Sequence, residues 1–562
     1  MILFIHPPVV KPCEPPAGIG KLCGVLRREG IPVSVLDANL EGLLGLLENS
    51  AAAETHPEDR WTARARRSCS RHLDTLRDLP SCRRPSRYRR AVSDLNRLLD
   101  RAVVNGAARP GLGNFRHPGL SPVRSGDLIH AAETPEENPF YPWFVKRIEG
   151  CLEREAPSFV GFSLNYLSQA LTTFAMIGFL KRTCPGLTLI LGGGLVTSWL
   201  SRPGWQNPFN GLVDHVIAGP GEGPLLDLLR SMPVSSMERK YKIGVGAPSG
   251  AHMKSSEEIL VLPEKFSIGE AEASPTHLNT SPPHTHAPPD YDGLPLHDYL
   301  SPGTILPYSA SRGCWWRKCV FCPERAEMNP YVPVSPGRVT SDLAALREKT
   351  SPVLIHLLDN AVSPALLEAM AKNPPGAPWY SFARITPHLT DPDFCRSLKR
   401  SGCALLKLGL ESGDQDVLDQ LEKGIHLGEA SRALRTLREA GIPAYVYLLF
   451  GTPAEGGESA RRTLDFVVKH GDCIDFLNVA VFNLPVFAAS SLKLETRDFY
   501  EGDLSLYTDF SHPRGWDRQQ VRTFLDREFR RHPAIAPILR RDPPVFTSNH
   551  APFFTKDFCS LR

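Results

Sequence analysis

Short apolar runs alternate with amphipathic stretches in the first part of the chain. Five of the runs have the length of buried strands: Met1–Ile5, Val33–Leu36, Phe159–Leu164, Leu187–Leu191 and Val213–Ala218. Between them, Ile19–Arg28 and Leu167–Thr183 carry apolar residues at helical spacing. Uniformly apolar strands that alternate with helices are typical of a parallel sheet. The pattern therefore predicts an open, doubly wound α/β sheet of the Rossmann-like type.

Two stretches interrupt this pattern. From about residue 50 to residue 140, the apolar spacing is helical and arginine is frequent, which predicts a basic helical insertion. We interpret its charge as a solvated helical face, with contact to an anionic partner as the alternative. Residues 246–297 are rich in Pro, Ser, His and Thr, which predicts a linker. The first domain is therefore expected over residues 1–245.

The alternation of strands and helices resumes after the predicted linker. Six runs are predicted as strands: Ile305–Ser309, Val353–Leu358, Trp379–Arg384, Leu405–Leu410, Ala444–Phe450 and Phe476–Val481. Helical stretches such as Pro364–Lys372 and Gly428–Ala440 lie between them. Six such units predict a partial (β/α)6 barrel of the TIM type over residues 298–500. Residues 501–562 are expected to form a cap or a substrate-facing tail.

Composition narrows the class of protein. The 562 residues are 42% hydrophobic and carry a net charge of only +3, so charge predicts neither a nucleic acid nor a membrane partner. No apolar run reaches the ~20 residues that span a bilayer, and the N-terminus lacks a basic region typical of a signal peptide. A cytoplasmic protein is expected, in which the thirteen cysteines do not form a disulfide framework.

Three cysteines lie close together directly after the first predicted barrel strand. Cys314, Cys319 and Cys322 supply soft thiolates, the ligands that iron–sulfur clusters require. Three thiolates leave one iron of a 4Fe–4S cluster open to a substrate. A zinc site is the alternative, with Cys319 and Cys322 as one ligand pair and Cys314 and a histidine as the other. The position after a barrel strand favours the cluster.

With Phe321 before its last cysteine, this triplet resembles the radical S-adenosylmethionine (SAM) superfamily. The usual spacing there is C-x3-C-x2-C, whereas this chain has C-x4-C-x2-C. Three further segments resemble the family at later strand ends, and each implies a contact to SAM. The resemblance implies that Asp359 and Asn360 contact its amino group and that Glu411 and Ser412 contact its ribose or methionine part. It implies that Gly451 and Pro453 lie near the adenine. Taken singly, a Glu-Ser pair is also a common helix cap and Gly-x-Pro a common turn.

The first domain resembles the cobalamin-binding domains that are fused to radical enzymes. The resemblance implies that the corrin lies across the C-terminal ends of the strands, where glycines let the nucleotide tail approach the backbone. It implies contacts from three segments, with Ser163, Leu164 and Tyr166 on the first, Gly193, Gly194 and Thr197 on the second, and Gly219 and Glu222 on the third. Glycine after a strand is also routine in α/β folds, and the chain lacks the D-x-H-x-x-G cobalt-ligand motif.

Together, the two resemblances imply a 4Fe–4S cluster, SAM cleaved to a 5′-deoxyadenosyl radical, and cobalamin for methyl transfer to an unactivated centre. The substrate is expected to be a small molecule or a peptide, and the electron donor a flavodoxin or ferredoxin. Cyclisation or rearrangement with the same cofactors is one alternative. A non-catalytic iron–sulfur or zinc protein is another.

Overall fold

The computed structural model describes residues 1–52, 59–103, 108–202, 204–231, 286–489, 492–499, 501–556 and 558. The chain divides into two compact units. Unit 1 comprises Met1–Arg77, Arg90–Leu300 and Glu501–Ser505, and unit 2 comprises Asp78–Arg89, Ser301–Tyr500 and Leu506–Arg562. Most of the predicted linker over residues 246–297 lies outside the described residues.

Unit 1 contains a five-stranded sheet in the order β2-β1-β5-β6-β7, and every pair of neighbours is parallel. Its strands are β1 (Ile2–Ile5), β2 (Val33–Leu36), β5 (Phe159–Ser163), β6 (Thr188–Gly192) and β7 (His215–Ile217). The chain passes from β1 to β2 on one side and then to β5 on the other side of β1. The order therefore reverses between β1 and β5, and the predicted doubly wound sheet is confirmed.

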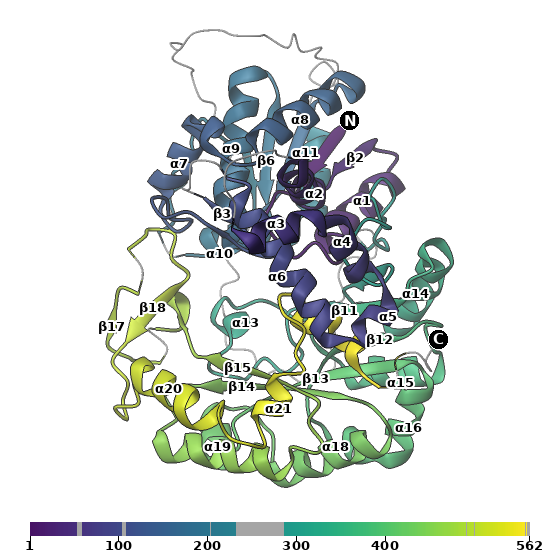
Figure 1. Ribbon diagram of the computed structural model, residues 1–562, viewed down its shortest axis with the longest axis vertical. Helices are drawn as coiled ribbons and strands as arrows, with labels where there is room; N and C mark the ends of the chain where they lie inside the picture. Colours follow the sequence, from purple (N-terminus) through teal and green to yellow (C-terminus); the bar gives the residue numbers. More distant parts are fainter. Residues whose placement is uncertain are drawn as a thin grey trace. The chain divides into compact units, whose positions relative to one another are not determined.

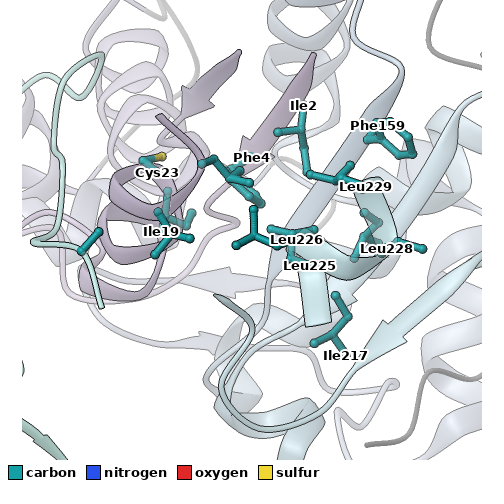
Figure 2. Close-up of a cluster of buried hydrophobic side chains, with 14 residues drawn as sticks. Ile2, Phe4, Ile19, Cys23, Phe159, Ile217, Leu225, Leu226, Leu228 and Leu229 are labelled. Atoms are coloured by element: carbon teal, nitrogen blue, oxygen red, sulfur yellow. The ribbon is translucent and has the colours of Figure 1, made fainter. Parts of the chain in front are cut away.

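One face of this sheet is covered by α1 (Ala17–Arg28) and α11 (Glu222–Ser231). Figure 2 shows Ile2 and Phe4 of β1 among Ile19 of α1 and the leucines of α11. Alternate strand residues share a face, which explains why Ile2 and Phe4 enter the same cluster. Helix α9 (Leu167–Thr183) is buried from Gln169 to Leu180, including the polar side chains of Gln169 and Thr173, which are hydrogen-bonded.

The region between β2 and β5 is mostly helical. It contains α2 (Ala38–Ala52), α3 (Arg60–Arg67), α4 (Cys69–Arg77), α5 (Leu79–Cys82), α6 (Pro85–Arg101), α7 (Ser125–Glu133) and α8 (Tyr141–Glu155). Asp59 caps α3 by accepting hydrogen bonds from the backbone N–H groups of Trp61 and Thr62. A two-stranded antiparallel ladder, β3 (Arg109–Pro110) with β4 (Phe115–Arg116), was not predicted. Strands of two residues are too short to show the alternating pattern from which a strand is predicted.

Unit 2 contains a six-stranded parallel sheet in the order β15-β14-β13-β12-β11-β8. Its strands are β8 (Ile305–Tyr308), β11 (Leu354–Val362), β12 (Trp379–Ala383), β13 (Cys403–Glu411), β14 (Ala444–Phe450) and β15 (Phe476–Val481). Between successive strands run α14 (Pro336–Thr350), α15 (Pro364–Lys372), α16 (Pro392–Arg400), α17 (Gln415–Gln420) with α18 (Leu427–Glu439), and α19 (Gly457–Lys469), on the outer side of the sheet (Figure 1). The predicted partial (β/α)6 barrel is confirmed.

The strands β14 and β15 have the predicted bounds residue for residue. Strand β11 differs, because it continues to Val362 instead of ending at Leu358. Its register against β12 shifts between Leu357 and Val362, so a bulge carries the strand past the end of its apolar run. Asp359 and Asn360 therefore lie within β11 and not after it.

The end of the chain packs on β14 of unit 2. Helix α20 (Arg518–Phe524) continues into a π-helix over Leu525–Phe529, and α21 (Ala536–Leu539) and α22 (Thr547–His550) follow. The rings of Phe524 and Phe529 lie 6.0 and 5.3 Å from that of Phe450. Tyr445 is hydrogen-bonded to Asp542, whose pKa burial raises to about 7. Within the described ranges, no helix combines the length and the hydropathy of a bilayer-spanning segment.

Candidate active site

The cysteine loop of unit 2 begins where β8 ends. The short strand β9 (Ser311–Arg312) pairs with β10 (Val332–Pro333), and this ladder brackets the loop. Gly313 has a φ of +67°, and a Cβ there would lie 2.4 Å from the Pro330 carbonyl oxygen, so the turn into the loop requires glycine. Cys314 and Cys322 are half-buried and Cys319 is buried.

Strand β11 supports this loop through Asp359. The buried Asp359 carboxylate accepts a hydrogen bond of 3.0 Å from the Ala310 N–H and another from the Ser311 hydroxyl. The neighbouring Asn360 side chain is exposed and donates to Glu324 Oε1 at 2.8 Å. The structure therefore gives both predicted cofactor contacts a local partner beside the cysteine loop.

Glu411, at the end of β13, lies beside the cysteines. Its backbone has a φ of +69°, which is uncommon for a residue other than glycine and turns the side chain at the strand end. Its Oε1 lies 2.8 Å from Lys423 Nζ, and the two side chains are only 13% and 8% exposed. The Lys423 ammonium lies 5.7 Å from the centre of the Phe321 ring. Glu411, Lys423 and Phe321 therefore form one continuous patch.

Arg384, directly after β12, is a buried cation at this site that the sequence did not identify. Its Nη1 lies 3.8 Å from Cys319 Sγ and its Nη2 donates to the Lys423 carbonyl oxygen. Burial lowers the pKa of Arg384, while the Cys319 thiol acts in the opposite direction. Burial raises the pKa of Cys319, and the charges of Lys423 and Arg384 oppose that rise. A lone arginine after a strand belongs to no pattern, so only the register of the strands reveals it.

Ser412 follows Glu411 but points into the protein. Its hydroxyl is fully buried, lies 3.1 Å from Thr463 Oγ1 and accepts a hydrogen bond of 3.1 Å from the Asp414 N–H. Asp414 in turn caps α17. The contacts of Ser412 are therefore those of a residue that joins β13 to α19.

The turn after β14 is held by Glu455. Gly451 has a φ of +80°, and its N–H donates to Glu455 Oε2 at 2.5 Å, as does the Trp516 indole N–H at 3.1 Å. Burial raises the pKa of Glu455 to about 7. The half-buried Pro453 is followed by Ala454, which lies in one apolar cluster with Phe321. The structure thus brings the turn against the cysteine loop.

The three thiols of the cysteine loop lie near one another. Cys314 and Cys319 both act electrostatically on the Cys322 thiol, so the three are neighbours. Across the described part of the chain, however, no three His, Cys, Asp or Glu side chains converge as the ligands of one metal ion. Tetrahedral zinc would hold its thiolate sulfurs within about 4 Å of one another. A 4Fe–4S cluster would bind each thiolate to a different iron, and three neighbouring thiols match that set of ligands.

The strand ends of unit 1 bring together the predicted segments around residues 163, 193 and 219. The Leu164 N–H donates to the Gly192 carbonyl at 2.8 Å, and the Asn165 side chain bonds Ser163 Oγ at 3.0 Å. Asn165 also accepts a hydrogen bond of 2.9 Å from the Gly194 N–H. Tyr166 is 60% exposed, one of three large exposed hydrophobic residues in the described chain.

Two glycines at this edge permit close approach of the backbone. Gly193 has a φ of +117°, and a Cβ there would lie 2.4 Å from the Leu164 carbonyl oxygen. The Thr197 hydroxyl donates to the Gly193 carbonyl and accepts from the N–H of Gly219, which has a φ of +68°. Glu222 is buried and lies 3.4 Å from Lys21, so its carboxylate links α11 to α1.

Comparison with known proteins agrees with this geometry. Residues 308–467 match the model of the radical SAM superfamily. An uncharacterized methyltransferase from Pyrococcus horikoshii is 25% identical over 191 residues, 32% of this chain and 40% of that protein. The bacteriochlorophyllide d C-12(1)-methyltransferase of Chlorobaculum tepidum is 26% identical over 208 residues, 34% of this chain and 44% of that protein. The alignments thus span less than half the length of these curated relatives.

Two solved structures resemble the chain over most of its length. The cobalamin-dependent SAM radical enzyme OxsB with aqua-cobalamin bound superposes with a TM-score of 0.51 and 12% identity, over 91% of this chain and 64% of that one. The radical SAM methyltransferase TsrM from Kitasatospora setae gives a TM-score of 0.48 and 15% identity, over 86% of this chain and 72% of that one. The likeness to OxsB shows a shared fold. The match to the radical SAM superfamily itself covers residues 308–467 of this chain.

Proposed function

We propose that this protein is a cobalamin-dependent radical SAM methyltransferase. The observation that carries the proposal is the set of three cysteine thiols after the C-terminal end of β8. The Lys423–Glu411 pair and Arg384 lie beside these thiols. Parallel β/α barrels place their chemistry at this end of the strands. Neighbouring thiolates beside buried cations suit a negatively charged iron–sulfur cluster, whose potential depends on nearby charge and on hydrogen bonds to its sulfurs.

In this proposal, Cys314, Cys319 and Cys322 hold a 4Fe–4S cluster with one open iron. When bound, the cluster and SAM supply a 5′-deoxyadenosyl radical, and cobalamin supplies a transferable methyl group. Glu411 offers a carboxylate to the polar end of SAM, and Lys423 holds that carboxylate in place. Phe321, with Ala454, Val417 and Leu421, provides an apolar surface for the adenine and excludes water from it.

The remaining predicted residues of unit 2 act through these groups. Asp359 holds the start of the cysteine loop through Ala310 and Ser311. Asn360 has an exposed side chain on β11 and in this proposal contacts the amino group of SAM. Gly451 and Pro453 shape the turn that carries Ala454, and Ser412 fixes the strand end that carries Glu411.

Cobalamin binding to unit 1 is supported by the exposed backbone and aromatic ring at its strand ends. Ser163, Leu164, Tyr166, Gly193, Gly194, Thr197 and Gly219 form an edge with an exposed aromatic ring and backbone groups close to the surface. A large uncharged macrocycle binds through surface area and backbone hydrogen bonds more than through ion pairs. The edge adjoins the reversal of strand order, where open α/β sheets bind ligands. Glu222 supports this edge by linking α11 to α1 through its ion pair with Lys21.

Methyl transfer is the reaction that the names of both curated relatives support. The proposed substrate is a small molecule or a peptide, and the proposed electron donor is a flavodoxin or ferredoxin. The twelve cysteines in the described ranges are free thiols, which supports the cytoplasm, a reducing compartment, as the location.

Anaerobic purification and reconstitution with iron, sulfide and cobalamin tests the proposal. We expect about four irons per chain, bound cobalt, and 5′-deoxyadenosine after reduction with SAM present. SAM labelled in its methyl group then separates methyl transfer from ring formation, because only methyl transfer moves the label into a product. Reduced, cluster-containing protein that yields no 5′-deoxyadenosine would contradict the proposal.

A further inference from the structure

The cysteine loop of this chain is one residue longer between its first two cysteines than the usual family spacing, and the structure shows how that residue is accommodated. Arg317 lies within the longer interval and adopts a φ of +55°, which turns the backbone sharply. The two preceding tryptophans anchor the loop at separate points. The Trp315 indole N–H donates to the Val362 carbonyl at 3.2 Å, and that of Trp316 donates to the Glu422 carbonyl at 3.0 Å.

Arg384 contacts both indole rings. Its guanidinium carbon lies 4.1 Å from the centre of the Trp316 ring and 5.6 Å from that of Trp315, and the two rings meet edge to face. Arginine over the face of tryptophan is a favourable cation–π contact, and its energy rises where water is excluded. Arg384 is only 7% exposed, so these contacts hold its charge inside the loop.

The same guanidinium reaches the ligand sulfur. Its Nη1 lies 3.8 Å from Cys319 Sγ, while its Nη2 donates to the Lys423 carbonyl. The planar fork of arginine makes both contacts at once and stacks on a ring as well, which the ammonium of a lysine cannot do. One side chain thereby connects the tryptophans of the longer loop, a proposed cluster ligand and the lysine that pairs with Glu411.

We infer that Arg384 is the positioning residue of the cluster, holding Cys319 in the longer loop and raising the reduction potential through its charge. The inference rests on the proposed function, because it takes the three cysteines to hold a 4Fe–4S cluster. Reduction adds one electron from the donor, converts the cluster from the 2+ to the 1+ state and breaks no bond. A cation that donates to a ligand sulfur stabilises the more negative reduced state and so raises the potential.

The test uses the reconstituted full chain and three variants. R384Q removes the charge and the fork, R384K keeps the charge but not the fork, and R325Q is the matched control. Arg325 lies in the same loop region and its side chain pairs with Glu422 at 2.8 Å, but this side chain is 42% exposed. Arg325 contacts the Cys322 thiol through its backbone N–H, which R325Q keeps. The readouts are the midpoint potential of the cluster by EPR-monitored titration and the rate of iron loss to a chelator.

We expect R384Q to lower the potential so that the ratio of reduced to oxidised cluster falls about tenfold, which is 59 mV for one electron. R384K should restore the potential but lose iron about 10-fold faster than the wild type, since the loss of such a supporting contact weakens metal binding 10- to 100-fold. R325Q should match the wild type in both. An intact R384Q cluster with the wild-type potential, or an equal shift in R325Q, overturns the inference.

The melting temperature of the apo-protein separates positioning from misfolding. If R384Q melts well below the wild type, the rate of iron loss from R384K is the deciding measurement. A wild-type rate in R384K overturns the positioning role. Failure of the proposed function looks different, because the wild-type protein itself would then assemble no cluster or cleave no SAM. If the wild-type protein has an active cluster and the variants behave like it, the role of Arg384 is contradicted and the proposed function is not.

Discussion

The two parallel sheets of this protein carry different chemistry at the same structural position. In unit 2, two buried cations, Arg384 and Lys423, and the nearly buried Glu411 lie beside the thiols after the first strand. The predicted segments at the strand ends of unit 1 bear glycines, hydroxyls and an exposed tyrosine, and their one acidic residue, Glu222, is paired with Lys21. A charged cofactor needs opposite charges in fixed positions, whereas a large uncharged one needs open backbone and surface area.

The comparison teaches that the same fold rule, chemistry at the carboxyl ends of parallel strands, is met in two ways. In unit 2, the proposed cluster site depends on side chains whose removal leaves charges without partners. In unit 1, the proposed cobalamin site depends on the absence of side chains, at positions that only glycine adopts easily. Five changes test this difference, from the largest expected effect to the smallest.

Replacement of a cluster ligand should have the largest effect. Cys319→Ala leaves two thiolates, so we expect loss of the cluster. The yield of 5′-deoxyadenosine should fall by more than about 100-fold, the upper limit for mutation of a residue that only supports a metal ligand. Iron analysis and product chromatography measure this. Cys395→Ala, in the buried face of α16, is the control and should retain iron. Full iron content in Cys319→Ala would remove the cysteine loop from the proposal.

Breaking the Lys423–Glu411 pair should destabilise unit 2. In Lys423→Met, Glu411 is left as a nearly buried charge, which costs about 3 kcal/mol of unfolding free energy. Denaturant unfolding of the apo-protein measures the loss. The double variant with Glu411→Gln leaves no charge behind and should recover most of it. Equal losses in the single and the double variant would show that the two side chains act independently.

Glu455 should make stability depend on pH. Its pKa is about 7 in the folded protein against an ordinary 4.5, so between these values the folded state binds more protons than the unfolded state. The free energy of unfolding therefore falls as pH rises through that window, by up to about 1.4 kcal/mol per pH unit. Below the window Glu455 is protonated in both states, and above it the loss is complete.

Glu455→Gln removes this dependence, because the amide oxygen still accepts from Gly451 and Trp516 and does not titrate. Unfolding experiments at pH 5 and pH 8 should show a flatter profile for the variant than for the wild type. Glu458→Gln, at a side chain that is 90% exposed, is the control and should follow the wild type. A Glu455→Gln profile parallel to that of the wild type would assign the pH dependence to other groups.

A side chain at Gly193 should damage unit 1 more than one at a helical glycine of the same unit. Gly193→Ala forces an unfavourable φ and places a Cβ against the Leu164 carbonyl, so we expect a loss of about 1–3 kcal/mol and weaker cobalamin binding. Gly150→Ala, in α8 of unit 1 and outside the proposed edge, is the matched control, because its Cβ would meet no atom within 4 Å. Retained cobalamin, read from the absorption spectrum, should separate the two. Equal retention would count against this edge as the binding site.

Ser412→Ala should have the smallest effect. Loss of the hydroxyl removes hydrogen bonds within the protein, which costs about 1 kcal/mol, and should leave the Kd for SAM unchanged. Isothermal titration with SAM and denaturant unfolding give the two values. A Kd raised more than about tenfold, equal to 1.4 kcal/mol, would instead favour the direct cofactor contact that the sequence predicts.

The sequence predicted the larger elements well and the short ones poorly. Strands β2, β14 and β15 and helices α9 and α15 have the predicted bounds, because strong apolar periodicity defines them. The bulge that extends β11 and the ladder of β3 with β4 escaped prediction, since neither leaves a periodic signal. Of the candidate site, spacing and resemblance predicted the cysteines and the segments around Glu411 and Gly451, but did not predict Arg384 or Lys423.

By itself, the sequence determined the two parallel sheets, the position of the thiols after the first barrel strand and the resemblance to radical SAM enzymes. These features are local, because apolar spacing and cysteine spacing are written along the chain. Only the tertiary structure decided which charges surround the thiols. Arg384 follows β12 and Lys423 lies beyond β13, so their approach to Cys319 depends on the parallel register of strands far apart in sequence. It also showed that Ser412 points inward, which no spacing of residues reveals.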